Sequence, residues 1–129
     1  MTKPYQSAEV THLLDVAPVE QALKAFAHDR DWEQFHSPKN LVMALSAEVG
    51  ELTEIFQWMT EQQSRTAAQD PTTAGAVREE LADVMLYLVR LASVLGVDLD
   101  GAVREKLRRN AEKYPVDKAR GSSKKYTQI

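Results

Sequence analysis

Residues 44–58 read ALSAEVGELTEIFQW, and this stretch decides the fold class. Apolar residues recur around Glu48 at helical spacing. On a helical wheel of about 100° per residue, they fall within about 60° of Glu48. These residues are Leu41, Leu45, Leu52, Ile55 and Met59. The stretch therefore predicts an amphipathic helix, but one whose apolar stripe has a carboxylate at its centre.

A second stretch repeats this arrangement. Glu80 also lies at the centre of an apolar stripe, whose other members are Val77, Val84, Tyr87 and Leu91. A further acidic residue follows three positions after each glutamate, on the same side of the predicted helix: Glu51 in the first stretch and Asp83 in the second. If the two stripes pack together, four carboxylates converge.

The rest of the chain indicates an all-α fold, because no alternation typical of strands persists. Pro18, Ser37 and Asp98 mark helix starts, and Gly96 marks a helix end. The predicted helices cover residues 18–32, 38–60, 74–95 and 98–113. The polar segment 61–73, which contains a proline, is predicted to be a loop.

The predicted architecture is a four-helix bundle with a flexible segment at each end. Residues 1–17 are expected to form a poorly ordered arm, residues 18–115 the helical domain, and residues 116–129 a basic, flexible tail.

Composition excludes several classes of protein. The 129 residues fit one domain, and 43% hydrophobic residues are enough to bury a core. A formal net charge of −3 gives no reason to expect nucleic acid or an anionic membrane as a partner. Without cysteine, there is no disulfide framework, zinc–thiolate site or thiol nucleophile. No apolar run approaches the roughly 18 residues of a membrane span, and no signal peptide is apparent. A soluble, cytoplasmic protein is therefore expected.

Four converging carboxylates require compensation. Removing water from one ionised carboxylate costs several kcal/mol, and four of them also repel each other. No lysine or arginine lies at the centre of either stripe. Oxygen ligands at i, i+3 spacing suit a hard divalent ion, Mg²⁺ or Mn²⁺. The competing interpretation is that the glutamates reach solvent or pair with distant basic residues.

Two kinds of metal site are compatible with a group of carboxylates in a helical bundle. A di-iron or di-manganese site normally uses Glu-x-x-His on two helices, whereas this chain offers that spacing only once, from Glu33 to His36, across a predicted helix break. A Mg²⁺ cluster instead implies work on a phosphate. Because the chain has no glycine-rich P-loop, ions and a few basic side chains would have to hold the phosphates.

These residues resemble a known family. The segments EVGE at 48–51 and EELADV at 79–84 resemble the acidic signature of the MazG-like all-α NTP pyrophosphatases. The segments RDWEQFHSPKNL at 30–41, EIFQW at 54–58, and KYP with SSKKYT near the end resemble the dCTP pyrophosphatase branch. The resemblance covers roughly residues 19–127.

The resemblance implies Mg²⁺-dependent hydrolysis of a nucleoside triphosphate to the monophosphate and pyrophosphate, with Mn²⁺ as a possible substitute. It implies that the metal ligands and catalytic residues are Glu48, Glu51, Glu80 and Asp83. It assigns the nucleobase and sugar pocket to Trp32, His36, Trp58 and Tyr87, although each of these could instead be an ordinary core or interface aromatic. It assigns triphosphate contacts to Lys106, Asn110, Lys113 and Tyr114, although these could instead form a solvated basic face.

The resemblance also implies a homo-oligomer, with a tetramer built as a dimer of dimers favoured over a dimer. The sequence departs from the vertebrate dCTP enzymes at Leu23, where they carry a histidine. The base preference therefore stays open among dCTP, 5-substituted dCTP and other dNTPs. The expected role is clean-up of the nucleotide pool. The alternatives are a broad-specificity dNTP pyrophosphatase and a non-enzymatic helical metal-binding assembly module.

Overall fold

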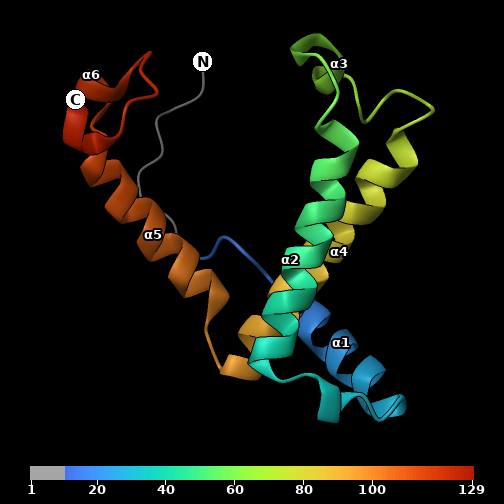
Figure 1. The fold of residues 1–129 in the computed structure, drawn as a ribbon. Helices are drawn as coiled ribbons and strands as arrows, with labels where there is room; N and C mark the ends of the chain where they lie inside the picture. Colours follow the sequence, from blue (N-terminus) through green and yellow to red (C-terminus); the bar gives the residue numbers. More distant parts are fainter. Residues whose placement is uncertain (1–10) are drawn as a thin grey trace. The chain divides into compact units, whose positions relative to one another are not determined.

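The computed structural model describes residues 11–129, and in this range the chain is helical without strands, which confirms the predicted all-α class (Figure 1). The elements are α1 (Ala17–Asp29), the 3₁₀ helix η2 (Glu33–Phe35), α2 (Pro38–Phe56), α3 (Glu61–Arg65), α4 (Ala74–Leu95), α5 (Leu99–Lys113), α6 (Val116–Ala119) and the 3₁₀ helix η3 (Tyr126–Gln128). They form two compact units, one of residues 16–97 and one that joins residues 11–15 to residues 98–129.

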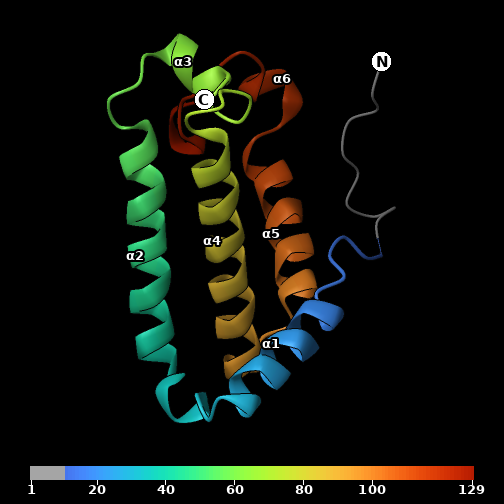
Figure 2. The same ribbon diagram turned by 90° about the vertical axis from the view of Figure 1, so that its right-hand side faces the viewer.

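Two long antiparallel helices organise the unit of residues 16–97. Helices α2 and α4 lie side by side in both ribbon views, and α1 packs against α4 (Figures 1 and 2). The core of this unit includes the fully buried side chains of Ala27, Leu41 and Val89, which come from α1, α2 and α4 respectively. The predicted stripes of α2 and α4 therefore do pack against each other.

The predicted helix boundary signals of the long helices are confirmed. The Ser37 side chain accepts a hydrogen bond from the Asn40 backbone N–H at 3.2 Å, with Pro38 in the first turn of α2. Gly96 follows α4 in the left-handed conformation, with φ of 68°. Asp98 caps α5 by accepting from the Gly101 N–H at 3.1 Å.

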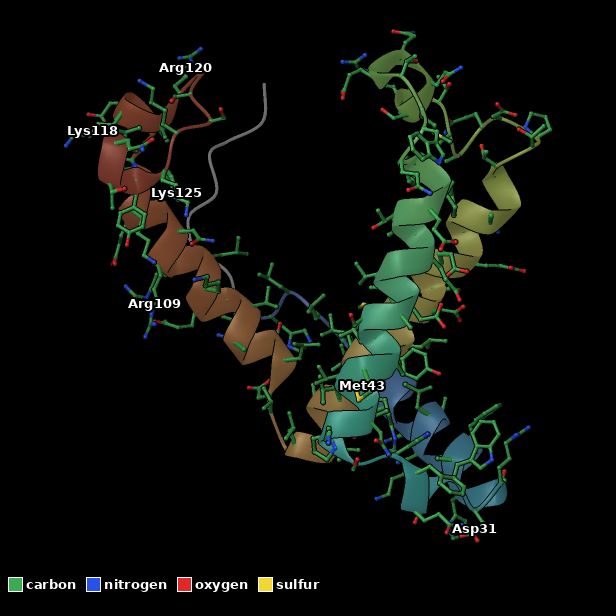
Figure 3. All side chains as sticks on the ribbon, in the orientation of Figure 1. Asp31, Met43, Arg109, Lys118, Arg120 and Lys125 are labelled. Atoms are coloured by element: carbon green, nitrogen blue, oxygen red, sulfur yellow. The ribbon has the colours of Figure 1, made fainter. Side chains whose placement is uncertain are left out.

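Two predicted helix ends and one predicted loop were wrong. Helix α1 ends at Asp29 instead of residue 32, because Asp31 adopts a left-handed φ of 53° and the Trp32 N–H bonds back to the Ala27 carbonyl (Asp31 is labelled in Figure 3). Helix α2 ends at Phe56, four residues early. The predicted loop contains α3, which Thr60 begins with a capping box.

A buried aspartate organises the second unit. Asp100 Oδ1 accepts hydrogen bonds from the backbone N–H groups of Leu13 and Leu14 at 2.7 and 2.8 Å, and Arg104 Nε donates to its Oδ2 at 2.9 Å. Asp100, in the first turn of α5, therefore ties the segment before α1 to α5. These hydrogen bonds hold the pKa of Asp100 at about 2.

The C-terminal segment folds back on α5. Tyr126 packs edge-on against Tyr114 with ring centroids 6.0 Å apart, and Lys113 Nζ lies 4.9 Å from the Tyr126 ring. The basic side chains of this segment gather around the C-terminal end of α5; Figure 3 labels Lys118, Arg120 and Lys125. The tail thus contains the short helices α6 and η3.

Residues 1–10 of the predicted arm lie outside the described residues, and the predicted division into arm, domain and tail stays a prediction. Between residues 11 and 129, none of the helices has the length and apolar character that crossing a membrane requires.

Candidate active site

The acidic residues predicted from the sequence meet between α2 and α4. One carboxylate oxygen each from Glu48, Glu80 and Asp83 lies within 4.8 Å of the other two. The helices bring them together because Glu48 and Glu80 lie in the stripes that pack, while Asp83 follows Glu80 by about one turn. The convergence predicted from the two stripes is present for these three residues.

The two central glutamates are held close together in a partly buried position. The Oε2 atoms of Glu48 and Glu80 are both buried, and neither has a hydrogen-bond partner. The neighbouring Glu48 carboxyl group, followed by burial and the nearby Glu51, raises the pKa of Glu80 from 4.5 to about 7. Metal-free protein therefore keeps a proton in this glutamate pair up to about neutral pH.

The acidic group fits a hard divalent cation. No ion pair between residues 11 and 129 joins Glu48, Glu80 or Asp83 to a lysine or arginine. Buried oxygens without partners are costly, and a cation that they coordinate would satisfy them. The donors are all carboxylate oxygens, the type that Mg²⁺ and Mn²⁺ prefer. Glu51, close enough to raise the pKa of Glu80, lies at the margin of this group.

A small cavity adjoins the acidic group. Its volume is about 160 Å³, below the roughly 300–1,000 Å³ of pockets that enclose a whole drug-sized ligand. It therefore suits one ring of a ligand. Asp83 belongs both to the acidic group and to the cavity wall. The full lining is Leu23, Phe26, Trp32, His36, Asp83, Leu86, Tyr87 and Arg90.

Three of the four predicted pocket aromatics line this cavity. Trp32 and His36 flank η2, whereas Tyr87 lies on α4. The Trp32 ring packs edge-on against Phe26 at 5.7 Å and against His36 at 6.5 Å, which holds the indole in place. Trp58 is absent from the lining and is 88% exposed just beyond the end of α2. Within one chain, the structure does not bring Trp58 to the cavity.

The predicted triphosphate contacts belong to the other unit. Lys106, Asn110 and Lys113 lie on α5, and Tyr114 directly follows it. Tyr114 and Lys113 contact Tyr126, so both take part in holding the C-terminal segment. Their part in substrate binding stays a prediction.

Arg90 is a site residue that was not predicted from the sequence. This α4 residue is only 8% exposed, lines the cavity, and donates from Nε to His36 Nδ1 at 3.1 Å. It follows Tyr87 by three positions, which places both on one side of α4, and this spacing was the available signal. Leu23, the position at which the sequence departs from the vertebrate dCTP enzymes, completes the apolar part of the wall with Phe26 and Leu86. Phe26 and Leu86 were also missed as site residues.

Curated proteins of similar sequence cover most of this chain. The chain is 50% identical over 104 residues to dCTP pyrophosphatase 1 of Rattus norvegicus and to that of Homo sapiens, and the match covers 81% of this chain. It covers 61% of each relative, so the chain spans less than two thirds of their length.

A solved structure agrees with the fold. A pyrophosphatase from Archaeoglobus fulgidus superposes with a TM-score of 0.72 at 35% identity, and the superposition covers 82% of this chain and 98% of that one. The MazG-like family model matches residues 43–129, a range that includes the acidic group and most of the described chain. The chain therefore belongs to the MazG-like family.

Proposed function

We propose that this protein is a Mg²⁺-dependent nucleoside triphosphate pyrophosphohydrolase that converts dCTP, and 5-substituted dCTP, to the monophosphate and pyrophosphate. One observation carries the proposal: Asp83 is shared by the acidic group and the cavity wall. In a nucleotide the α-phosphate is the phosphate nearest the base. A base held in the cavity therefore brings the α-phosphate to the acidic group before the γ-phosphate.

The chain's own residues have distinct parts in this reaction. The aromatic walls of Trp32 and Tyr87 offer surfaces on which a base stacks, and the apolar side chains around them exclude water. The carboxylates of Glu48, Glu80 and Asp83, with Glu51 at the margin, would hold Mg²⁺, or Mn²⁺ in its place. When bound, the ion would supply charge neutralisation at the phosphate oxygens and activation of the attacking water.

The proposed bond change is a single displacement. Water adds to the α-phosphorus, the bond from that phosphorus to the bridging oxygen breaks, and pyrophosphate leaves. The relatives named dCTP pyrophosphatase 1 support this choice of substrate. The proposed role is removal of unwanted nucleotides from the pool, and the proposed location is the cytoplasm.

The test is a panel of the four dNTPs and 5-methyl-dCTP, incubated with and without Mg²⁺ and assayed separately for pyrophosphate and orthophosphate. The proposal predicts Mg²⁺-dependent pyrophosphate release, with dCTP or its 5-methyl derivative preferred. Equal rates on all dNTPs would instead support a broad-specificity pyrophosphatase. Orthophosphate alone, or no turnover, would overturn the proposed reaction.

A matched pair of variants links turnover to the acidic group. Glu80→Gln removes a charge from the group, whereas Glu79→Gln removes a charge from an exposed neighbour on the same helix. Turnover should be lost in the first variant and kept in the second. Equal activity in both would separate the acidic group from catalysis and overturn the part proposed for it.

We also propose a homo-oligomer, with a tetramer favoured. Four exposed apolar residues share one face of α4 at i, i+4, i+7 and i+14 spacing: Leu81, Met85, Leu88 and Leu95. The exposed Trp58 adds a large apolar surface near the end of α2. Light scattering after gel filtration should give about four times the 14.5 kDa of one chain, and Leu88→Asp should lower that mass. A wild-type mass of one chain would contradict the proposal.

A further inference from the structure

Arg90 is a buried charge whose position in the cavity wall lacks an ordinary structural explanation. Buried arginines are usually paired with carboxylates, yet no ion pair involving Arg90 exists between residues 11 and 129. Its hydrogen bond from Nε goes to the imidazole of His36, a ring that can serve either as donor or as acceptor. Both residues line the cavity.

This hydrogen bond fixes where His36 carries its proton. A guanidinium has only donors, so the His36 Nδ1 atom at 3.1 Å must offer its lone pair. A neutral imidazole with a free lone pair on Nδ1 carries its hydrogen on Nε2. A doubly protonated ring would lose this bond and place two positive charges side by side. Burial, followed by the charge of Arg90, lowers the pKa of His36, in agreement with a neutral ring.

We propose that Arg90 is a positioning residue that holds His36 as the neutral Nε2–H tautomer, so that His36 offers a fixed hydrogen-bond donor to the nucleobase. The donor half of this inference rests on the proposed function, whereas the tautomer half concerns the free protein. The matching ligand group is a lone pair on a pyrimidine, and in cytosine the ring nitrogen N3 and the carbonyl oxygen O2 supply one. A base that presents only N–H groups at this point would leave two donors facing each other.

The competing interpretation is purely structural. The Arg90–His36 bond joins α4 to the residue that follows η2, so its loss could simply loosen that segment. If the bond is only a structural tie, His36 need not change its tautomer when another side chain replaces Arg90. Loss of the tie would then lower the stability of the protein without selectively weakening substrate binding. The test therefore needs a readout of the tautomer itself.

The experiment uses the full chain with ¹⁵N-labelled histidine and long-range ¹H–¹⁵N spectra at neutral pH. The chain has three histidines, and His36→Gln identifies the resonances of His36 by their absence. The expected wild-type spectrum shows His36 with an unprotonated Nδ1 and a protonated Nε2. Arg90→Gln should populate the other tautomer, because an amide side chain can accept as well as donate. Arg78→Gln, at an exposed position of the same helix, should leave the spectrum unchanged.

Kinetics with dCTP supply the second readout. Loss of one well-oriented hydrogen bond should raise KM for dCTP about tenfold in Arg90→Gln, with a much smaller change in kcat. Arg78→Gln should keep both wild-type values. An equal fall in kcat and kcat/KM with unchanged KM would refute the donor half.

The two halves of the inference fail separately. A wild-type His36 with its proton on Nδ1, or on both nitrogens, overturns the inference without any variant having to fold. If the tautomer is as expected but no dNTP is hydrolysed, the proposed function fails and the role of Arg90 in fixing the tautomer stands. An unchanged tautomer in a folded Arg90→Gln, judged by circular dichroism, overturns the positioning role.

Discussion

Binding of Mg²⁺ should displace a proton from the acidic group, in an amount that depends on pH. The pKa of Glu80 in the metal-free protein is about 7, because its carboxyl group lies against Glu48 in a partly buried position. A group with this pKa holds about 0.9 proton at pH 6, about 0.5 at pH 7 and about 0.1 at pH 8. Coordination requires the ionised carboxylate, so binding should release those amounts per chain.

Isothermal titration calorimetry measures the released protons. Mg²⁺ is titrated into the protein in two buffers with different ionisation enthalpies at each pH. The difference in observed enthalpy, divided by the difference between the buffers, gives the number of protons. Glu79→Gln should repeat the wild-type values, since this residue is exposed and outside the group. Glu80→Gln should bind Mg²⁺ more weakly and lose the pH dependence.

The sign of the accompanying stability change follows from the same pKa. Native metal-free protein keeps the Glu80 proton up to about pH 7, whereas the unfolded chain loses it near pH 4.5. The metal-free fold should therefore become less stable as the pH rises from about 4.5 to about 7, and added Mg²⁺ should oppose this loss. Tight Mg²⁺ binding with no proton release at pH 6 would refute the reasoning.

Three further predictions concern the fold. Leu41→Ala should lower the free energy of unfolding by about 2–5 kcal/mol in urea titrations, because Leu41 is 2% exposed. Met43→Ala, at a position that is 61% exposed, should lower it by less than about 1 kcal/mol. Equal losses would contradict the assigned core. The pKa of Asp100, about 2, predicts a stabilisation that is present above about pH 4 and lost as the pH falls to about 2. Acid titration by circular dichroism should show a smaller loss of stability in Asp100→Asn than in wild type, because the variant keeps the similar contribution of Glu105. Gly96→Ala should lower the thermal midpoint of unfolding, because the φ of Gly96 is 68°. Gly75→Ala should raise the midpoint, because Gly75 lies inside α4 with open space where a Cβ would be. The reverse order would contradict the role of Gly96 as the C-terminal cap of α4.

The sequence predicted the long helices well because their signals are local. The bounds of α4 agree with the prediction, since its apolar stripe and the left-handed Gly96 both lie within the segment itself. Helix α3 was missed because the polar character of its residues outweighed the Thr60–Gln63 capping box, which was present in the sequence. Helix α2 was predicted too long because apolar Met59 continues the stripe past the true end of the helix at Phe56. In both cases the polar and apolar pattern was given more weight than the helix boundary.

The acidic group could be predicted because each helix carries a carboxylate where packing requires an apolar residue. The contact of Arg90 with His36 could not be predicted from a helical wheel, because a wheel describes only one helix and His36 lies 54 positions away. The wheel also assumed that the helix containing Trp58 continued to residue 60. Because α2 ends at Phe56, a wheel of that helix does not place Trp58.

The central claim is that the carboxylates of Glu48, Glu51, Glu80 and Asp83 bind a divalent ion between α2 and α4. Crystals grown with Mn²⁺, with anomalous diffraction measured to locate the manganese, test it most directly. The account predicts an anomalous peak in direct coordination contact with oxygens of at least three of these residues. Manganese bound only elsewhere on the chain, with this group of carboxylates intact and empty at saturating Mn²⁺, would contradict the account.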